Sequence, residues 1–122
     1  MSEDERWFAW SADAIEQAVD TERLVINPVI FAEVSVRYRR IEDLDEILPP
    51  TMFDREAIPF AAAFLAGKAY TAYRRRGGAR RSPLPDFFIG AHAAVAGYRL
   101  LTRDATRYHA YFPKLNLIAP DQ

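Results

Sequence analysis

Two aspartates, Asp86 and Asp104, stand near the start and at the end of the largely apolar stretch "SPLPDFFIGAHAAVAGYRLLTRD". The chain has no cysteine and no evident histidine pair, so clustered carboxylate oxygens favour Mg²⁺ or Mn²⁺ over zinc as a bound cation. Such a cation can polarise a phosphodiester and lower the pKa of a bound water. If the fold brings the two aspartates together, they are candidates for hydrolysis at a phosphate.

The distribution of charge is a second reason to consider these aspartates as candidate site residues. Residues 1–56 carry 14 acidic and 6 basic side chains, a net charge of -8, whereas residues 57–122 carry 10 basic and 3 acidic ones, a net charge of +7. The three acids of the second part are Asp86, Asp104 and Asp121. Solubility alone does not explain two acids set among so many arginines, and the basic charge indicates a polyanionic partner.

The arginines differ in what they indicate. Arg80 and Arg81 lie in "RRRGGARRSPLP", a basic loop bounded by Gly and Pro, and are the better candidates for contacts with phosphates. Arg74–Arg76 end an expected helix, where cations favour the macrodipole, so a solvated last turn and a contact with a phosphate are both open.

The elements that must position these residues alternate between helices and short strands. Helices are expected at 4–19, 28–40, 41–50, 59–78 and 85–97, strands at 23–28, 98–102 and 115–120, and a turn or short helix at 104–112. This order predicts an α/β fold, with a mostly parallel central sheet flanked by helices. With 122 residues, the chain fits one domain spanning 1–122.

Element lengths place the two aspartates at one edge of that sheet. A helix from Asp86 to Ala96 rises roughly 16 Å, and a strand from Tyr98 to Arg103 returns roughly 17 to 20 Å. If Gly97 reverses the chain between them, Asp86 and Asp104 arrive at the same sheet edge.

Glu33 is expected near that edge too, because it follows the strand "LVIN" by less than two helical turns. Its spacing from Val29, Ile30 and Val36 puts it on their apolar face. Three carboxylates then converge at the carboxyl edge of a parallel sheet, where open α/β folds usually bind ligands.

The order of "NPVIFAEVS", "SPLPDFFIGAHA" and "LLTRD" resembles that of the PIN-domain ribonucleases, specifically the VapC toxins of toxin-antitoxin modules, over essentially the whole chain. The resemblance implies a metal-dependent endoribonuclease acting on RNA, with Mg²⁺ or Mn²⁺ held by Glu33, Asp86 and Asp104 as catalytic carboxylates. It implies that Thr102 supports the site by hydrogen bonding. It also implies a homodimer and a cognate antitoxin that blocks the active site.

The start of the chain departs from that family. Its members usually open with a short hydrophobic strand that ends in an aspartate, the first metal ligand, whereas "MSEDERWFAW" corresponds to the helix after that strand. Since that strand lies in the middle of the family's sheet, its loss removes hydrogen-bonding partners on both sides. Two hypotheses follow: a nuclease whose start lies upstream, or a truncated inactive homologue that binds its antitoxin and dimerises.

Each acidic residue also has a structural explanation. Asp86 suits the first turn of a helix, and Asp104 can cap the next turn or pair with Arg107. Glu33 can turn outward and pair with Arg37, a surface arrangement of little energetic worth. Only their joint placement, together with the family pattern, favours a shared site.

The remaining features bear on location. The acidic start has no signal-peptide pattern, and charge, Gly or Pro interrupts every long apolar run. With no cysteine, a cytoplasmic protein without a membrane span is expected. Neither His92 nor His109 is assigned a role.

Overall fold

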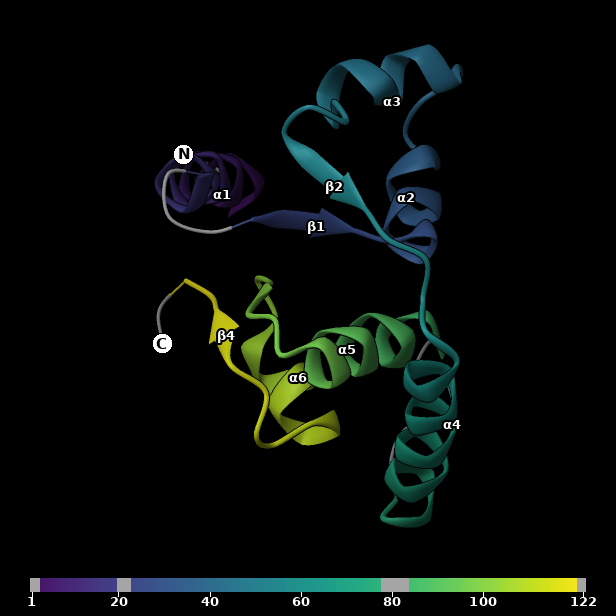
Figure 1. The fold of residues 1–122 in the computed structure, drawn as a ribbon. Coiled ribbons are helices and arrows are strands. Elements are labelled where there is room, and N and C mark those ends of the chain that lie inside the picture. Colours follow the sequence, from purple (N-terminus) through teal and green to yellow (C-terminus); the bar gives the residue numbers. More distant parts are fainter. Residues whose placement is uncertain (1–2, 20–22, 78–83, 121–122) are drawn as a thin grey trace. The chain divides into compact units, whose positions relative to one another are not determined.

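The computed structural model describes residues 3–19, 23–77 and 84–120 (Figure 1). The chain divides into two compact units, Met1–Ala57 and Ile58–Gln122. This division falls one residue after Glu56, where the charge of the sequence changes sign. The first unit is therefore acidic and the second basic.

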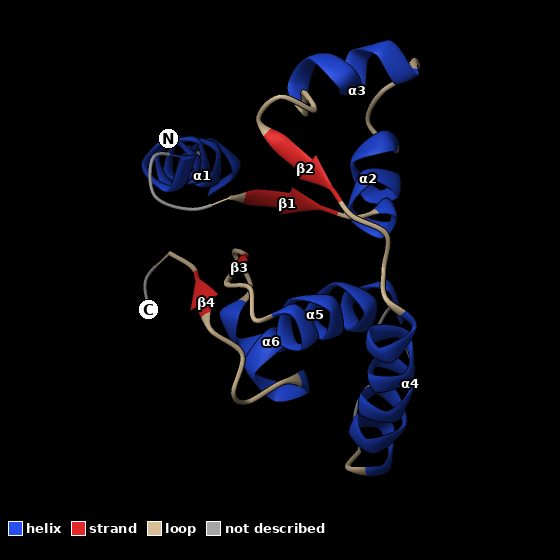
Figure 2. Ribbon diagram, in the orientation of Figure 1, coloured by secondary structure: helices blue, strands red, loops and turns tan. Residues whose placement is uncertain are grey.

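The first unit combines helices with one pair of strands. Its elements are α1 (Glu3–Val19), β1 (Leu24–Ile26), α2 (Pro28–Ser35), α3 (Ile41–Ile47) and β2 (Phe53–Arg55). The two strands pair in parallel, with Leu24 opposite Phe53 and Ile26 opposite Arg55 (Figure 2). Because parallel strands need a crossover connection, α2 and α3 lie between them in the chain.

Helix α2 begins at the residue that the sequence predicts but is shorter than predicted. The Asn27 side chain accepts a hydrogen bond of 2.9 Å from the backbone N–H of Ile30, and Pro28 occupies the first turn, where its missing N–H costs no helical bond. The expected helix over 28–40 stops at Ser35. Its Oγ donates to the carbonyl of Phe31 at 2.7 Å, a local bond that competes with regular helical bonding.

Within residues 58–77 and 84–120, the second unit has three helices and a second strand pair. Its elements are α4 (Phe60–Arg75), α5 (Leu84–Ala96), β3 (Leu100–Leu101), α6 (Ala105–Tyr111) and β4 (Leu117–Ile118). Strands β3 and β4 pair in parallel, with Leu100 opposite Leu117. Gly97, with a φ of 75°, ends α5 in the left-handed region, which confirms that the chain reverses there.

Aromatic side chains fill the core of the second unit. Phe87 of α5 is completely buried, stacks on Tyr111 with ring centroids 3.9 Å apart, and meets the edge of Tyr70 at 5.2 Å. Ala62 and Ala66 of α4 are also fully buried, because small side chains let α4 pack closely on α5. This packing holds the start of α5 in a fixed place.

The observed elements confirm a mixed α/β fold with parallel strand pairs, and they add one strand. Strand β2 was not expected, since "FDR" is only three residues long and shows no apolar alternation. In the part of the chain that the structure describes, the four strands form two separate two-stranded sheets. No described helix combines the length and the apolar character that a membrane span requires.

Candidate functional site

Asp86 lies in the first turn of α5, one residue before the buried Phe87. Only 12% of its side-chain surface is exposed. A carboxylate at this depth requires a cationic or hydrogen-bonding partner, because burial disfavours its charged form. The packing that buries Phe87 therefore also fixes an acidic group in a place where it must be neutralised.

Asp104 is held from two sides at the junction of β3 and α6. Its Oδ1 accepts a hydrogen bond of 3.1 Å from the backbone N–H of Arg107, which caps α6. Its own backbone N–H donates to Thr102 Oγ1 at 3.0 Å, and the backbone N–H of Thr102 donates to the carbonyl of Ile118 at 3.0 Å. These two hydrogen bonds tie Asp104 to the β3–β4 pair, and the role of Thr102 in supporting a metal site stays a prediction.

Arg107 brings the two aspartates together. Its Nη1 donates to Asp86 Oδ2 at 2.9 Å, and its Nε lies 3.3 Å from Asp104 Oδ2. Burial lowers the pKa of the Arg107 guanidinium, but the charge of Asp86 and the hydrogen bond to it outweigh this effect, so that the pKa is raised. The guanidinium thus stays protonated and balances one of the two carboxylates.

Gly90 of α5 leaves room for Tyr108 of α6 and for Phe112, which follows α6. It lies one helical turn after Asp86 on the same face of α5. A Cβ at position 90 would lie 2.5 Å from Phe112 Cε2 and 3.4 Å from Tyr108 Cδ1. Since Phe112 follows α6 directly, a larger residue at position 90 would force the Phe112 ring, and the end of α6 next to it, to shift away from α5.

Comparison with known proteins shows which solved structures share the fold of this chain. No family model and no curated protein sequence matches the chain. Among solved structures, it is similar to a chain of VapBC2 from Rickettsia felis bound to a DNA fragment from their promoter, with a TM-score of 0.69 and 18% identity over 88% of this chain and 83% of the other. It is also similar to a chain of VapBC-1 from nontypeable Haemophilus influenzae, with a TM-score of 0.66 and 17% identity over 88% and 82%.

This chain has a PIN-like fold. The resemblance that the sequence motifs indicate is therefore confirmed at the level of the fold.

Glu33 belongs to the first unit of the PIN-like chain, whereas Asp86 and Asp104 belong to the second. Its side chain is exposed on α2, and Val36, expected to share a buried face with it, is 86% exposed. The apolar-face prediction for these two residues is thus wrong: α2 ends before Val36. The role of Glu33 stays a prediction.

Two further expectations concern the arginines predicted to bind RNA and the number of metal ligands. Arg80 and Arg81 lie outside the described residues. Across residues 3–19, 23–77 and 84–120, no three His, Cys, Asp or Glu side chains are grouped closely enough to hold a metal ion. The site visible within one unit thus has two carboxylates and one guanidinium.

These two carboxylates still fit a magnesium ion. Mg²⁺ retains several waters and is commonly held by one or two protein carboxylates together with substrate phosphates. Asp86 and Asp104 each direct an Oδ2 atom at the same cation, the guanidinium of Arg107. The position is therefore one that attracts positive charge, and its oxygen donors suit a hard divalent ion.

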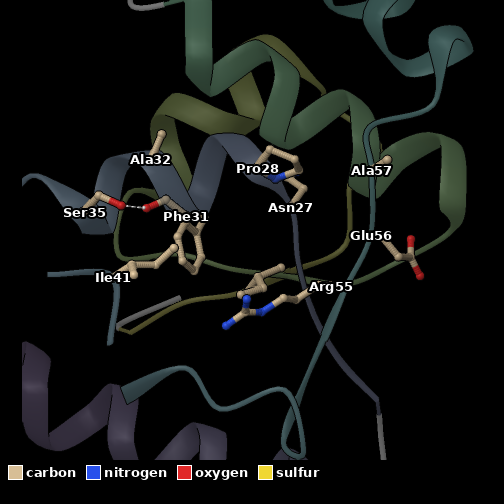
Figure 3. A pocket seen from close by; sticks show the side chains of 10 residues that line it. Asn27, Pro28, Phe31, Ala32, Ser35, Ile41, Arg55, Glu56 and Ala57 are labelled. Atoms are coloured by element: carbon tan, nitrogen blue, oxygen red, sulfur yellow. Dashed lines mark hydrogen bonds between the residues drawn. The ribbon is translucent and has the colours of Figure 1, made fainter. Parts of the chain in front are cut away.

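The first unit has a different feature, a pocket of about 650 Å³ beside α2 (Figure 3). Its lining is mostly apolar, with Phe31 and Ile41 among the side chains, and Arg55 lies over the Phe31 ring at 5.0 Å. The pocket contains none of the predicted site residues.

Sequence reasoning missed the contact between Arg107 and Asp86. The spacing of three residues between Asp104 and Arg107 predicts one half of the cluster. Asp86 is 21 residues from Arg107, and no local pattern connects them.

Proposed function

We propose that this chain is a metal-dependent endoribonuclease of the VapC type, which cleaves RNA phosphodiester bonds and is neutralised by a cognate antitoxin. One observation carries the proposal: Asp86 and Asp104 both contact a single guanidinium, within a chain of PIN-like fold. Paired carboxylates held in a fixed geometry are what a Mg²⁺ or Mn²⁺ site requires.

Asp86 and Asp104 are the residues that would hold the metal ion, and Glu33 is proposed as a further ligand from the first unit. When bound, the ion supplies Lewis-acid polarisation of a phosphate oxygen and a lowered pKa for water. Asp104 is the better anchored carboxylate, because its Oδ1 caps α6 while its Oδ2 faces the cation position. Thr102 keeps the Asp104 backbone in place.

RNA would be attracted by the second unit, where Arg80 and Arg81 are proposed to contact phosphates. The net charge of +7 over residues 57–122 supports this assignment, since neutralisation of phosphates dominates the affinity of proteins for nucleic acids. Binding of RNA should therefore weaken steeply as the salt concentration rises.

The proposed protein partners are a cognate antitoxin and a second copy of this chain. The two similar structures described above are both of VapBC, which supports an antitoxin partner. Phe60 and Phe64, 94% and 68% exposed on α4, supply apolar surface of the kind that protein partners cover.

The decisive experiment measures cleavage of a random-sequence oligoribonucleotide pool with Mg²⁺ or Mn²⁺. The Asp86→Asn variant should cut about a hundredfold more slowly or not at all, because the amide is a much weaker ligand than the carboxylate. Asp45→Asn is the matched control, since Asp45 also pairs with an arginine, Arg55, at 2.7 Å. That variant should cleave at the wild-type rate.

Two results would contradict the proposal. One is equal cleavage by wild type and Asp86→Asn, which would assign the activity to another site or a contaminant. The other is the absence of cleavage and of Mn²⁺ binding by the folded wild-type chain, together with tight binding of the antitoxin encoded next to it. This second result would favour the non-catalytic, antitoxin-binding hypothesis.

A further inference from the structure

Arg107 has an arrangement that metal binding alone does not explain. Its guanidinium contacts both carboxylates proposed as metal ligands, Asp86 Oδ2 at 2.9 Å and Asp104 Oδ2 at 3.3 Å. A cation at that place would have to share these oxygens with Arg107.

The position of Arg107 is fixed by its backbone rather than by its ion pairs. The backbone N–H of Arg107 donates to Asp104 Oδ1 at 3.1 Å, and the next residue, Tyr108, is buried against α5. The side chain beyond this anchor is 46% exposed. The guanidinium can therefore leave the carboxylates while its Cα stays in place, and an anion from solvent can reach it.

The charges of the cluster show what such a movement would achieve. Two carboxylates and one guanidinium carry a formal charge of -1, which repels a phosphodiester. A divalent cation bound to the same carboxylates raises the total by two, to +1 for these groups, or to zero when Glu33 also binds the ion. In either case the total is one unit more positive with Arg107 nearby than without it, so Arg107 supplies charge that favours the phosphate.

We propose that Arg107 binds the phosphate of the RNA substrate, and that Asp86 and Asp104 hold its guanidinium in the resting protein until a divalent cation takes its place. This inference rests on the proposed function. The planar guanidinium, with five N–H donors, suits a phosphate better than a lysine ammonium does. Arg107 thereby couples metal binding to substrate binding.

The first measurement is the affinity for Mn²⁺ by calorimetry. Arg107→Gln removes the positive charge and keeps most of the side chain. Because the guanidinium no longer competes with Mn²⁺ for the two carboxylates, the variant should bind Mn²⁺ about tenfold more tightly than wild type. Lys114→Gln is the control, because it removes one positive charge from an exposed side chain of the same unit. Tighter Mn²⁺ binding shows that Arg107 and the metal ion compete for the two carboxylates, and the RNA measurement tests whether Arg107 also binds phosphate.

The second measurement is binding of a phosphorothioate oligoribonucleotide, whose linkages resist cleavage. Wild type should bind it about tenfold more tightly with Mn²⁺ than without, and Arg107→Gln should lose most of this gain. Arg107→Lys keeps the charge but not the planar fork, so its Mn²⁺ affinity should stay near that of wild type while its RNA affinity falls.

The outcomes separate this inference from the proposed function. Mn²⁺ binding by wild type with unchanged Mn²⁺ and RNA affinities in Arg107→Gln would overturn the role of Arg107 and leave the nuclease proposal standing. A folded wild-type chain that binds no Mn²⁺ would overturn both. Tighter Mn²⁺ binding by Arg107→Gln, with its RNA affinity no longer raised by Mn²⁺, is the result that supports Arg107.

Discussion

The two units each contain an aspartate–arginine contact of similar length, but the surroundings differ. In the first unit, Arg55 lies 2.7 Å from Asp45, with side chains 40% and 48% exposed. In the second unit, Arg107 lies 2.9 Å from Asp86, which is only 12% exposed, and it also faces Asp104. In the first unit, one carboxylate faces one guanidinium and both side chains are solvated. In the second unit, two carboxylates face one guanidinium, and one of them, Asp86, is largely buried. Distance alone does not distinguish a surface ion pair from a candidate site.

The helix caps of the two units show the same contrast. Asn27 caps α2 by accepting from the third residue along, as Asp104 does for α6. A neutral amide is thus sufficient for such a cap, and both residue types rank equally well there. The charge of Asp104 is more than capping requires, which agrees with a second task for this side chain.

The largest expected effect comes from Gly90→Ala. The added methyl would lie 2.5 Å from the Phe112 ring. The free energy of unfolding should therefore fall by about 1–3 kcal/mol, the usual effect of overpacking. Moving α6 away from α5 would also carry Asp104, which caps α6, away from Asp86 and so weaken Mn²⁺ binding. Urea unfolding and calorimetry on the same sample measure the two effects.

Gly67→Ala in α4 is the control for this change. Nothing lies within 4 Å of a Cβ at position 67, so alanine should stabilise the helix by about 0.5–1 kcal/mol. If both variants had the same stability, the close approach of α5 and α6 would not be what positions the site.

An intermediate effect is expected at the two caps. Asp104→Ala and Asn27→Ala should each lower stability by about 1 kcal/mol, because each leaves a helix N–H without its side-chain acceptor. Asp104→Asn should keep most of the stability of α6 and lose Mn²⁺ affinity. A variant Asp104→Asn that binds Mn²⁺ like wild type would show that Asp104 only caps the helix.

The smallest effect is expected at the exposed ion pair. Asp45→Asn should change the free energy of unfolding by less than about 0.5 kcal/mol, since both partners remain solvated. Asp86→Asn should cost more, because it leaves Arg107 with one carboxylate instead of two. Equal losses in the two variants, measured by urea unfolding, would remove the distinction between the pairs.

Most elements could be predicted from the sequence because their signals are local. The pattern "NP" marked the start of α2, and Gly97 marked the end of α5. Strand β2 escaped prediction, since three residues cannot show a period and its conformation depends on pairing with β1. The end of α2 was also misplaced, because the apolar residues beyond Ser35 lie on an exposed segment rather than a helix.

The candidate site was predicted only in part, for a similar reason. The lengths of α5 and the following strand indicated that Asp86 and Asp104 would meet, and both contact Arg107. The contact between Arg107 and Asp86 spans 21 residues, and Gly90 packs against the distant Phe112; neither feature leaves a pattern in the sequence.

The sequence by itself determined the α/β order of elements, the opposed charges of the two parts and the acids that could do chemistry, because each of these depends on residue type and local spacing. Only the tertiary structure decided that one guanidinium would contact both Asp86 and Asp104 and that Gly90 would lie against the Phe112 ring. These contacts depend on how closely two helices pack, and packing distances follow from the shapes of side chains far apart in the chain.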